Sequence, residues 1–312
     1  MKNVGNSLTA TVKHCHQAEH SLSRRDGIDN ECSDMTIWKD MDDQVPGGVY
    51  LCQVSENVSC GACCGLYNVP DPSRNALEGM LVRRTTLFET VPRNWEDIED
   101  FGRQMAAEAS GDRPFPEFHH CPYIGLIDPG RSRVGCLLHP LADGNNGIDF
   151  RGLSYYGGMA CRLYFCPTFN KGPELLKDLI RHAAADWYHY GLIITEADLL
   201  CAIFDQLRSI SSGDFKRLRR FDNGPSLDCI RQLMDLKLIW PFQPFPETDR
   251  VNYFFKDGLY AKPSVAYKGN GLTFSRYDDI FKNLVSVFQT DEHLRRAEAI
   301  IERLITDMAN IL

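Results

Sequence analysis

Three thiols lie within five residues in Cys60-Gly61-Ala62-Cys63-Cys64-Gly65. Cysteines are packed this densely where several thiolates converge on one centre, and the glycines let the backbone turn tightly around it. Cys60 and Cys63 also have the spacing at which a tight loop presents two sulfurs to one ion, as in structural zinc sites and iron–sulfur loops. The stretch therefore predicts half of a metal site.

The other half is expected from cysteines further along the chain. The candidate metal ligands are Cys60, Cys63, Cys64, Cys121, Cys136, Cys161, Cys166 and His139. Seven thiols and one imidazole exceed the four donors of a closed zinc site. Because neighbouring side chains diverge, Cys63 and Cys64 are not expected to be equivalent ligands of one ion. Three alternatives stay open: a polynuclear centre, two sites, or a set in which some cysteines are not ligands.

Other interpretations of the same residues are weaker. Buried cysteines can act as small hydrophobic side chains, but these are clustered and are repeatedly flanked by Gly and Pro. A disulfide framework conflicts with the reducing cytoplasm expected below. His139, three residues after Cys136, is either a ligand or a histidine hydrogen-bonded within its loop. Cys52 is an outside candidate.

Composition bounds the class of protein. The 312 residues are 43% hydrophobic and 24% charged, as in soluble globular proteins. No apolar run reaches the roughly 20 residues that span a bilayer, and the polar N-terminus lacks the apolar region of a secretory signal. We therefore expect a cytoplasmic protein without a membrane partner. The net charge of -8 disfavours binding to nucleic acid, which needs a positive surface.

The pattern along the chain predicts an α+β protein in three parts. A disordered or loosely attached leader is expected over 1–47, an irregular cysteine-cluster metal-binding domain with short strands over 48–170, and a mainly α-helical domain over 171–312. The Gly- and Pro-rich stretch 114–167 needs a further constraint, which a metal would supply. A strand is predicted at 49–54. Helices are predicted at 74–83, at 95–109 and at 173–191, the second with Asn94 as its N-cap. Three further helices are predicted: one that begins after a Thr195 cap, one that begins at 225, and one that begins after a Thr290 cap.

Four segments together resemble a known family. They are 57–64, Cys121-Pro122-Tyr123-Ile124, Gly135-Cys136-Leu137-Leu138-His139-Pro140 and Ala160-Cys161-Arg162-Leu163-Tyr164-Phe165-Cys166. In this order they are similar to the CxxCxxCC zinc- or iron-chelating family, the YkgJ-like cysteine-cluster proteins, over roughly residues 50–170. The first cysteine of the family motif is replaced here by Asn57, with Cys52 as the candidate to substitute for it.

The resemblance implies a zinc or iron–sulfur centre and, through some relatives, protein lysine N-methylation with S-adenosylmethionine as a cofactor. Against a methyltransferase of the usual architecture, no glycine-rich fingerprint follows a predicted strand. The alternative hypothesis is a non-enzymatic, metal-stapled module that docks a protein partner or holds metal. A thiol–disulfide oxidoreductase using Cys60 and Cys63 is a weaker third hypothesis, because the expected βαβ context is missing.

Overall fold

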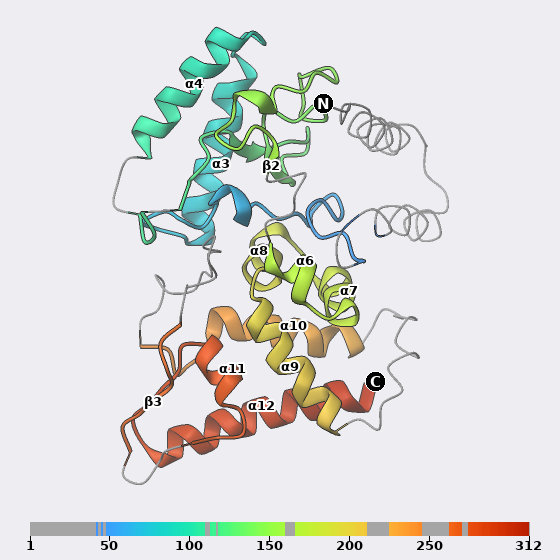
Figure 1. Ribbon diagram of the computed structural model, residues 1–312, viewed down its shortest axis with the longest axis vertical. Coiled ribbons are helices and arrows are strands. Elements are labelled where there is room, and N and C mark those ends of the chain that lie inside the picture. The colour runs from blue at the N-terminus through green and yellow to red at the C-terminus, as the bar shows by residue number, and fades with distance from the viewer. Residues whose placement is uncertain are drawn as a thin grey trace, which may run out of the picture.

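The computed structural model describes residues 42, 45, 48–109, 113–116, 118–159, 166–210, 225–244, 262–269 and 274–311. Within these residues helices predominate and the strands are short, so the mixed α and β character predicted from the sequence is confirmed at this coarse level. In Figure 1, α3, α4 and β2 lie at one end of the molecule, and α9, α11 and α12 lie at the other. No described helix is both long enough and apolar enough to cross a bilayer.

The cysteine-rich part contains two long helices and one hairpin. The elements are η1 (Ala62–Cys64), α3 (Arg74–Glu89), α4 (Trp95–Glu108), β1 (Ile124–Leu126), β2 (Val134–Cys136) and η2 (Arg151–Leu153). The predicted cap of α4 is confirmed, because Asn94 Oδ1 accepts a hydrogen bond from the Asp97 amide at 3.1 Å. β1 and β2 pair antiparallel, with Ile124 opposite Cys136.

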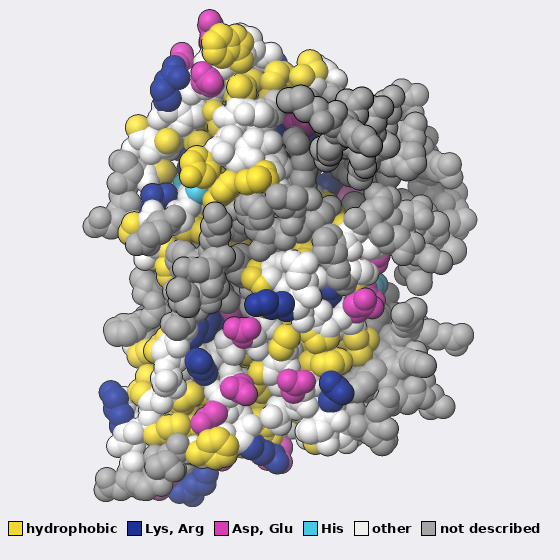
Figure 2. All heavy atoms as spheres, in the orientation of Figure 1, with side chains coloured by type: hydrophobic (Ala, Val, Ile, Leu, Met, Phe, Trp, Pro, Cys, Tyr) yellow, Lys and Arg dark blue, Asp and Glu magenta, His cyan; other side chains and the backbone are white. Residues whose placement is uncertain are grey.

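The helical part begins at Cys166. Its elements are α6 (Pro167–Lys171), α7 (Glu174–Ala183), α8 (Trp187–Ile194), α9 (Ala197–Ile210), α10 (Pro225–Ile239), β3 (Ala266–Tyr267), α11 (Asp278–Asn283), β4 (Val287–Phe288) and α12 (Asp291–Ile311). The helix predicted after Thr290 is confirmed as α12, and its apolar stripe is buried against α9 and α10. The cap at Thr290 is confirmed, because its Oγ1 accepts from the His293 amide. Positive and negative side chains intermix over this part of the surface (Figure 2).

Four predicted elements were wrong in detail. The helix predicted over 74–83 continues to Glu89. Residues 49–54 form no strand, since only Gln53 makes an isolated bridge, to Ser59. The helix predicted over 173–191 is two helices, because the Asp186 side chain accepts from the His189 amide and starts α8 anew. Thr195 does not cap α9 through its hydroxyl; instead Oγ1 donates to the Gly191 carbonyl at 3.0 Å and closes α8.

The aromatic stretch that begins at Trp240 packs in the core over its described residues. Trp240 stacks on Phe281 with ring centroids 5.9 Å apart, and its Nε1 donates to Ser286 Oγ at 2.8 Å. Phe242 is buried beside it. These two residues therefore serve core packing, whereas 245–255 lie outside the described residues.

Hydrophobic packing crosses residue 170 in both directions. Val45 and Val58 pack into the core of the helical part, although they precede the cysteine loop. In the other direction, Tyr188 of α8 joins the core under α3, where it meets Tyr67 edge to face at 6.2 Å. The two parts therefore bury apolar surface against each other and do not merely share a linker.

Candidate metal centre

The cysteine loop is compact because its glycines allow close approach. Cys63 and Cys64 lie in η1, and Gly65 ends it with φ of 75°, a left-handed conformation that suits glycine. A Cβ at Gly65 would collide with the backbone carbonyl of His119, and a Cβ at Gly61 would lie 2.6 Å from Ile124 Cδ1. The tight backbone predicted from the glycines is therefore confirmed.

The collision at Gly65 marks a second segment that runs beside the loop. The Cys121 amide donates to the Cys64 carbonyl at 2.8 Å. One residue earlier, His120 Nδ1 lies 2.7 Å from the Gly65 carbonyl. These bonds hold two cysteines from distant parts of the sequence side by side, as a shared site requires.

A buried guanidinium stabilises this second segment. Arg84 of α3 donates to the Cys121 carbonyl at 3.1 Å and to His120 Nε2 at 2.9 Å. Since a guanidinium only donates, Nε2 must accept and Nδ1 must carry the proton given to Gly65. Desolvation, with the neighbouring Arg84 charge, lowers the pKa of His120 to about 4. Desolvation also lowers the pKa of Arg84 to about 10, and the charge of Cys121 opposes that shift.

The described sulfurs fall into two neighbouring groups. We define the outer group as Cys63, Cys64 and Cys121, because Cys63 and Cys64 are neighbours in η1 and the Cys121 amide binds the Cys64 carbonyl. Their charges also act on the Tyr156 hydroxyl. Burial raises the pKa of Tyr156, and these charges add to the rise. Cys136 lies nearby on β2, where its charge and that of Cys121 both act on Tyr123.

The inner group consists of Cys52, Cys60 and Cys166, which pack in or against the core that contains Tyr190 of α8. Burial raises the pKa of Tyr190, and the charges of these three thiols add to the rise. The Cys60 amide donates to the Cys52 carbonyl at 2.9 Å, so a tight loop returns the chain to its starting point. Desolvation raises the pKa of Cys60 to about 12, and the charge of Cys166 adds to the rise. Both thiols are therefore protonated at neutral pH in the absence of a cation.

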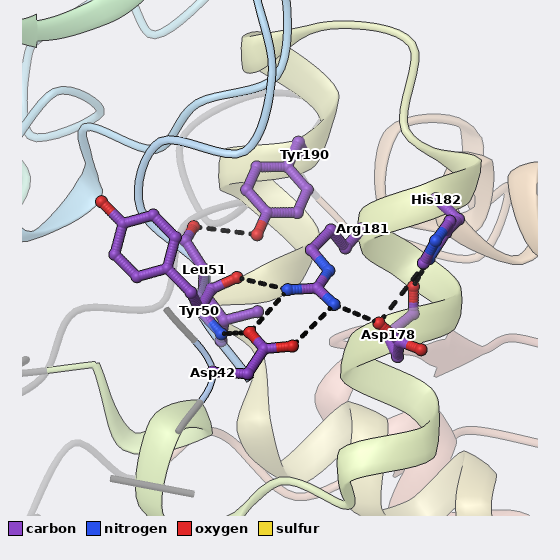
Figure 3. Close-up of polar contacts among 7 residues, drawn as sticks. All are labelled: Asp42, Tyr50, Leu51, Asp178, Arg181, His182 and Tyr190. Atoms are coloured by element: carbon purple, nitrogen blue, oxygen red, sulfur yellow. Dashed lines mark hydrogen bonds and ion pairs between the residues drawn. The ribbon is translucent and has the colours of Figure 1, made fainter. Parts of the chain in front are cut away.

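A salt-bridge network fixes the approach to the inner group (Figure 3). The buried guanidinium of Arg181 in α7 binds both carboxylate oxygens of Asp42, at 2.8 and 3.1 Å, and also reaches Asp178 at 2.5 Å. Tyr50 donates its amide to Asp42 at 2.6 Å. Tyr190 donates its hydroxyl to the Leu51 carbonyl at 2.8 Å. Leu51 is thus tied to α8, and Tyr50 is tied to α7 through its carbonyl, which accepts from Arg181 at 3.3 Å.

The remaining predicted ligands are placed differently. His139 Nδ1 accepts from the Leu141 amide at 3.1 Å, and its own amide donates to the Cys136 carbonyl, so the ring takes part in a turn. Cys161 lies outside the described residues. Among the described residues, no three or more His, Cys, Asp or Glu side chains come close enough together to hold a metal ion. The sulfurs are gathered into neighbourhoods without reaching ligand distances from one point.

Sequence reasoning missed three residues of this region. Arg84 gave no signal, because its partners lie 36 and 37 residues away. His119 and His120 directly precede Cys121, and the run of two imidazoles and a thiol was a signal that could have been used.

Comparison with known proteins adds no relative. No protein-family model, no curated protein and no solved structure matches the chain.

Proposed function

We propose that the cysteine cluster binds a zinc ion or an iron–sulfur centre through thiolates. The observation that carries the proposal is the hydrogen-bonded pairing of Cys121 with Cys64, which brings a second cysteine segment against the three-thiol loop. Cys60 and Cys166 bring a further pair of distant segments together, since both pack in or against the core of the helical part. Four regions of sequence thus contribute thiols to two adjoining groups.

The chemistry of the donors fits such a centre. Thiol sulfur is the ligand that zinc and iron–sulfur clusters prefer, whereas magnesium and calcium need oxygen ligands. Cys64 and Cys121, with Cys63 as a non-equivalent neighbour, would hold the metal in the outer group, and Cys60 and Cys166 in the inner group. A bound metal would stabilise the thiolates and add its binding free energy to folding. Because burial raises the pKa of Cys60 and of Cys166 and keeps both thiols protonated, binding at the inner group would release protons and weaken as the pH falls.

The position of the inner group favours a metal-stapled module over an enzyme. Cys60 lies in the cysteine loop, whereas Cys166 is the residue that precedes α6 and begins the helical part. A metal shared by these two sulfurs would join the parts at the place where their cores already meet. A structural role of this kind needs a closed site and no substrate channel.

Metal analysis tests the proposal directly. Protein purified without air should carry zinc and be colourless, or carry iron with inorganic sulfide and be brown. Cys64→Ala and Cys121→Ala should each lose most of that metal, because both sulfurs belong to the outer group. Cys201→Ala and Cys229→Ala are matched controls, since these thiols lie on α9 and α10 and should leave the metal content unchanged. Equal metal content in all four variants would reject the site.

A further inference from the structure

Cys52 and Cys60 lie opposite each other across a short antiparallel ribbon. Gln53 and Ser59 form the bridge of this ribbon, and beside the bridge the Cys60 amide donates to the Cys52 carbonyl at 2.9 Å. Directly opposed residues of an antiparallel pair have Cα atoms about 4.5–5.5 Å apart. A disulfide needs its two Cα atoms about 4.4–6.8 Å apart. The backbone therefore places the two cysteines at the spacing that a disulfide requires.

The ribbon directs both cysteine side chains to one face. Side chains alternate between the two faces, so opposed residues and residues two positions further along share a face. The Val54 amide donates to the Val58 carbonyl at 2.9 Å, and both of these valines are buried in the core of the helical part. Cys52 and Cys60 pack against that same core. Packing and alternation therefore agree that the two sulfurs lie on the same side of the ribbon.

The bridge residues fix the register through contacts on the other face. Gln53 Nε2 donates to the Val134 carbonyl at 2.8 Å, and Ser59 Oγ accepts from the Val134 amide at 2.9 Å. Both side chains thus bind β2, on the face away from the two cysteines. Since a slip of one residue would turn every side chain to the wrong face, these bonds keep Cys52 and Cys60 opposed.

We propose that Cys52 and Cys60 form a reversible disulfide with each other when the protein is oxidised. Glutathione disulfide is a sufficient oxidant: one cysteine sulfur displaces a first glutathione to give a mixed disulfide, and the other cysteine sulfur then displaces the second. The S–S bond of the oxidant breaks, one S–S bond forms in the protein, and both thiol protons pass to glutathione. A reducing cytoplasm disfavours permanent disulfides but allows transient, redox-sensing pairs of this kind.

The disulfide would also control the inner group. A sulfur in a disulfide is no longer a thiolate, so oxidation would remove Cys60 as a metal ligand. Only this consequence rests on the proposed function. The pairing of Cys52 with Cys60 needs no metal.

Thiol labelling of the full-length, metal-free protein tests the pairing. The protein is equilibrated with mixtures of reduced and oxidised glutathione, and the remaining thiols are blocked with one alkylating reagent. The oxidised cysteines are then reduced and labelled with a second reagent, which tandem mass spectrometry places on individual residues. Cys52 and Cys60 should carry the second label together, at least about tenfold above Cys201, because each has the other as an intramolecular partner at high effective concentration.

Two variants identify the partners. In Cys52→Ala, Cys60 should lose most of its second label. Cys63→Ala is the matched control, since Cys63 packs against the same core, and it should leave the labelling of Cys52 and Cys60 unchanged. Second label that stays on Cys60 in Cys52→Ala would overturn the proposal, as would equal labelling of Cys52, Cys60 and Cys201 in the wild type. The wild-type result decides the pairing even if a variant does not fold. The metal content of the reduced protein is measured separately, so the thiolate centre stands or falls on its own.

Discussion

Residues 118–159 and residues 274–311 are held in shape by different means. The first stretch contains the three-residue strands β1 and β2, the short η2 and a series of turns. The second is mostly α11 and α12, with a continuous buried stripe along α12. A helix satisfies its backbone internally, whereas the turns of 118–159 depend on side chains such as Asn145, which donates to the Leu137 and His139 carbonyls. Only the first stretch needs a further constraint.

Removing the proposed metal should produce the largest difference between the two stretches. Chelation should raise amide hydrogen exchange by orders of magnitude in 118–159 and in the loop around Cys60, because metal binding is coupled to their folding. Amides of α9 and α12 should keep their protection, since an apolar core holds them. Mass spectrometry of exchanged peptides measures both. A uniform response along the chain would mean that the two parts are stabilised in the same way.

The helical part should instead lose stability when one of its buried charges is left without a partner. Glu196 is fully buried and accepts hydrogen bonds from Lys237 Nζ and from Lys262 Nζ, the latter at 2.6 Å. Glu196→Gln would leave two buried ammonium groups without their anion and should cost about 3–5 kcal/mol of unfolding free energy.

Urea unfolding measures this loss against a matched control. Glu302→Gln removes an equally direct ion pair, with Arg276, in which both side chains are 60% exposed, and should change stability by less than about 1 kcal/mol. Similar losses in the two variants would contradict the assignment of Glu196 as a core charge.

Acid should affect the cysteine-rich part through His120. Desolvation holds its pKa at about 4 in the folded protein, below the ordinary value of 6.5. Between these values the unfolded chain binds the proton and the folded protein does not, so stability falls as the pH drops from about 6.5 toward 4. His120→Asn should reduce this slope, and the remainder should come from His119, whose pKa desolvation also lowers to about 4. Thermal midpoints of metal-free protein at several pH values measure the slope, and an unchanged slope in the variant would count against the assignment.

The smallest expected effect comes from removing a helix N-cap. Asn94→Ala removes the side-chain acceptor at the start of α4 and should cost about 1 kcal/mol. Ser73→Ala at the start of α3 should cost less, because its hydrogen bond to the Ala76 amide is longer, at 3.4 Å. Urea unfolding of both variants checks the order, and the reverse order would mean that packing around α3 and α4 outweighs their caps.

Local chemistry explains which parts of the fold could be predicted. Asn94 and Thr290 act within three residues of themselves, and the α12 stripe repeats at helical spacing, so the sequence contains all the information. The break before α8 was missed because apolar periodicity continues across it, and only the Asp186 cap marks it.

Distant contacts explain which parts of the site could not be predicted. The thiols were recognisable by type and spacing, yet their division into an outer and an inner group depends on packing with the helical part and on the backbone bond between Cys121 and Cys64. The His119 ring contacts the rings of Tyr155 and Tyr156, which lie more than thirty positions away. Such distant contacts cannot be predicted from the spacing of residues along the chain.

The salt bridge between Asp42 and Arg181 has a consequence for biosynthesis. Asp42 and Arg181, like Leu51 and Tyr190, are separated by 139 residues. At the usual speed of translation, on the order of 10 s pass between the emergence of the first partner and that of the second. During that interval the nascent thiols of the loop have no helical surface to cover them. Metal delivered while the ribosome is still at work would meet them at their most accessible.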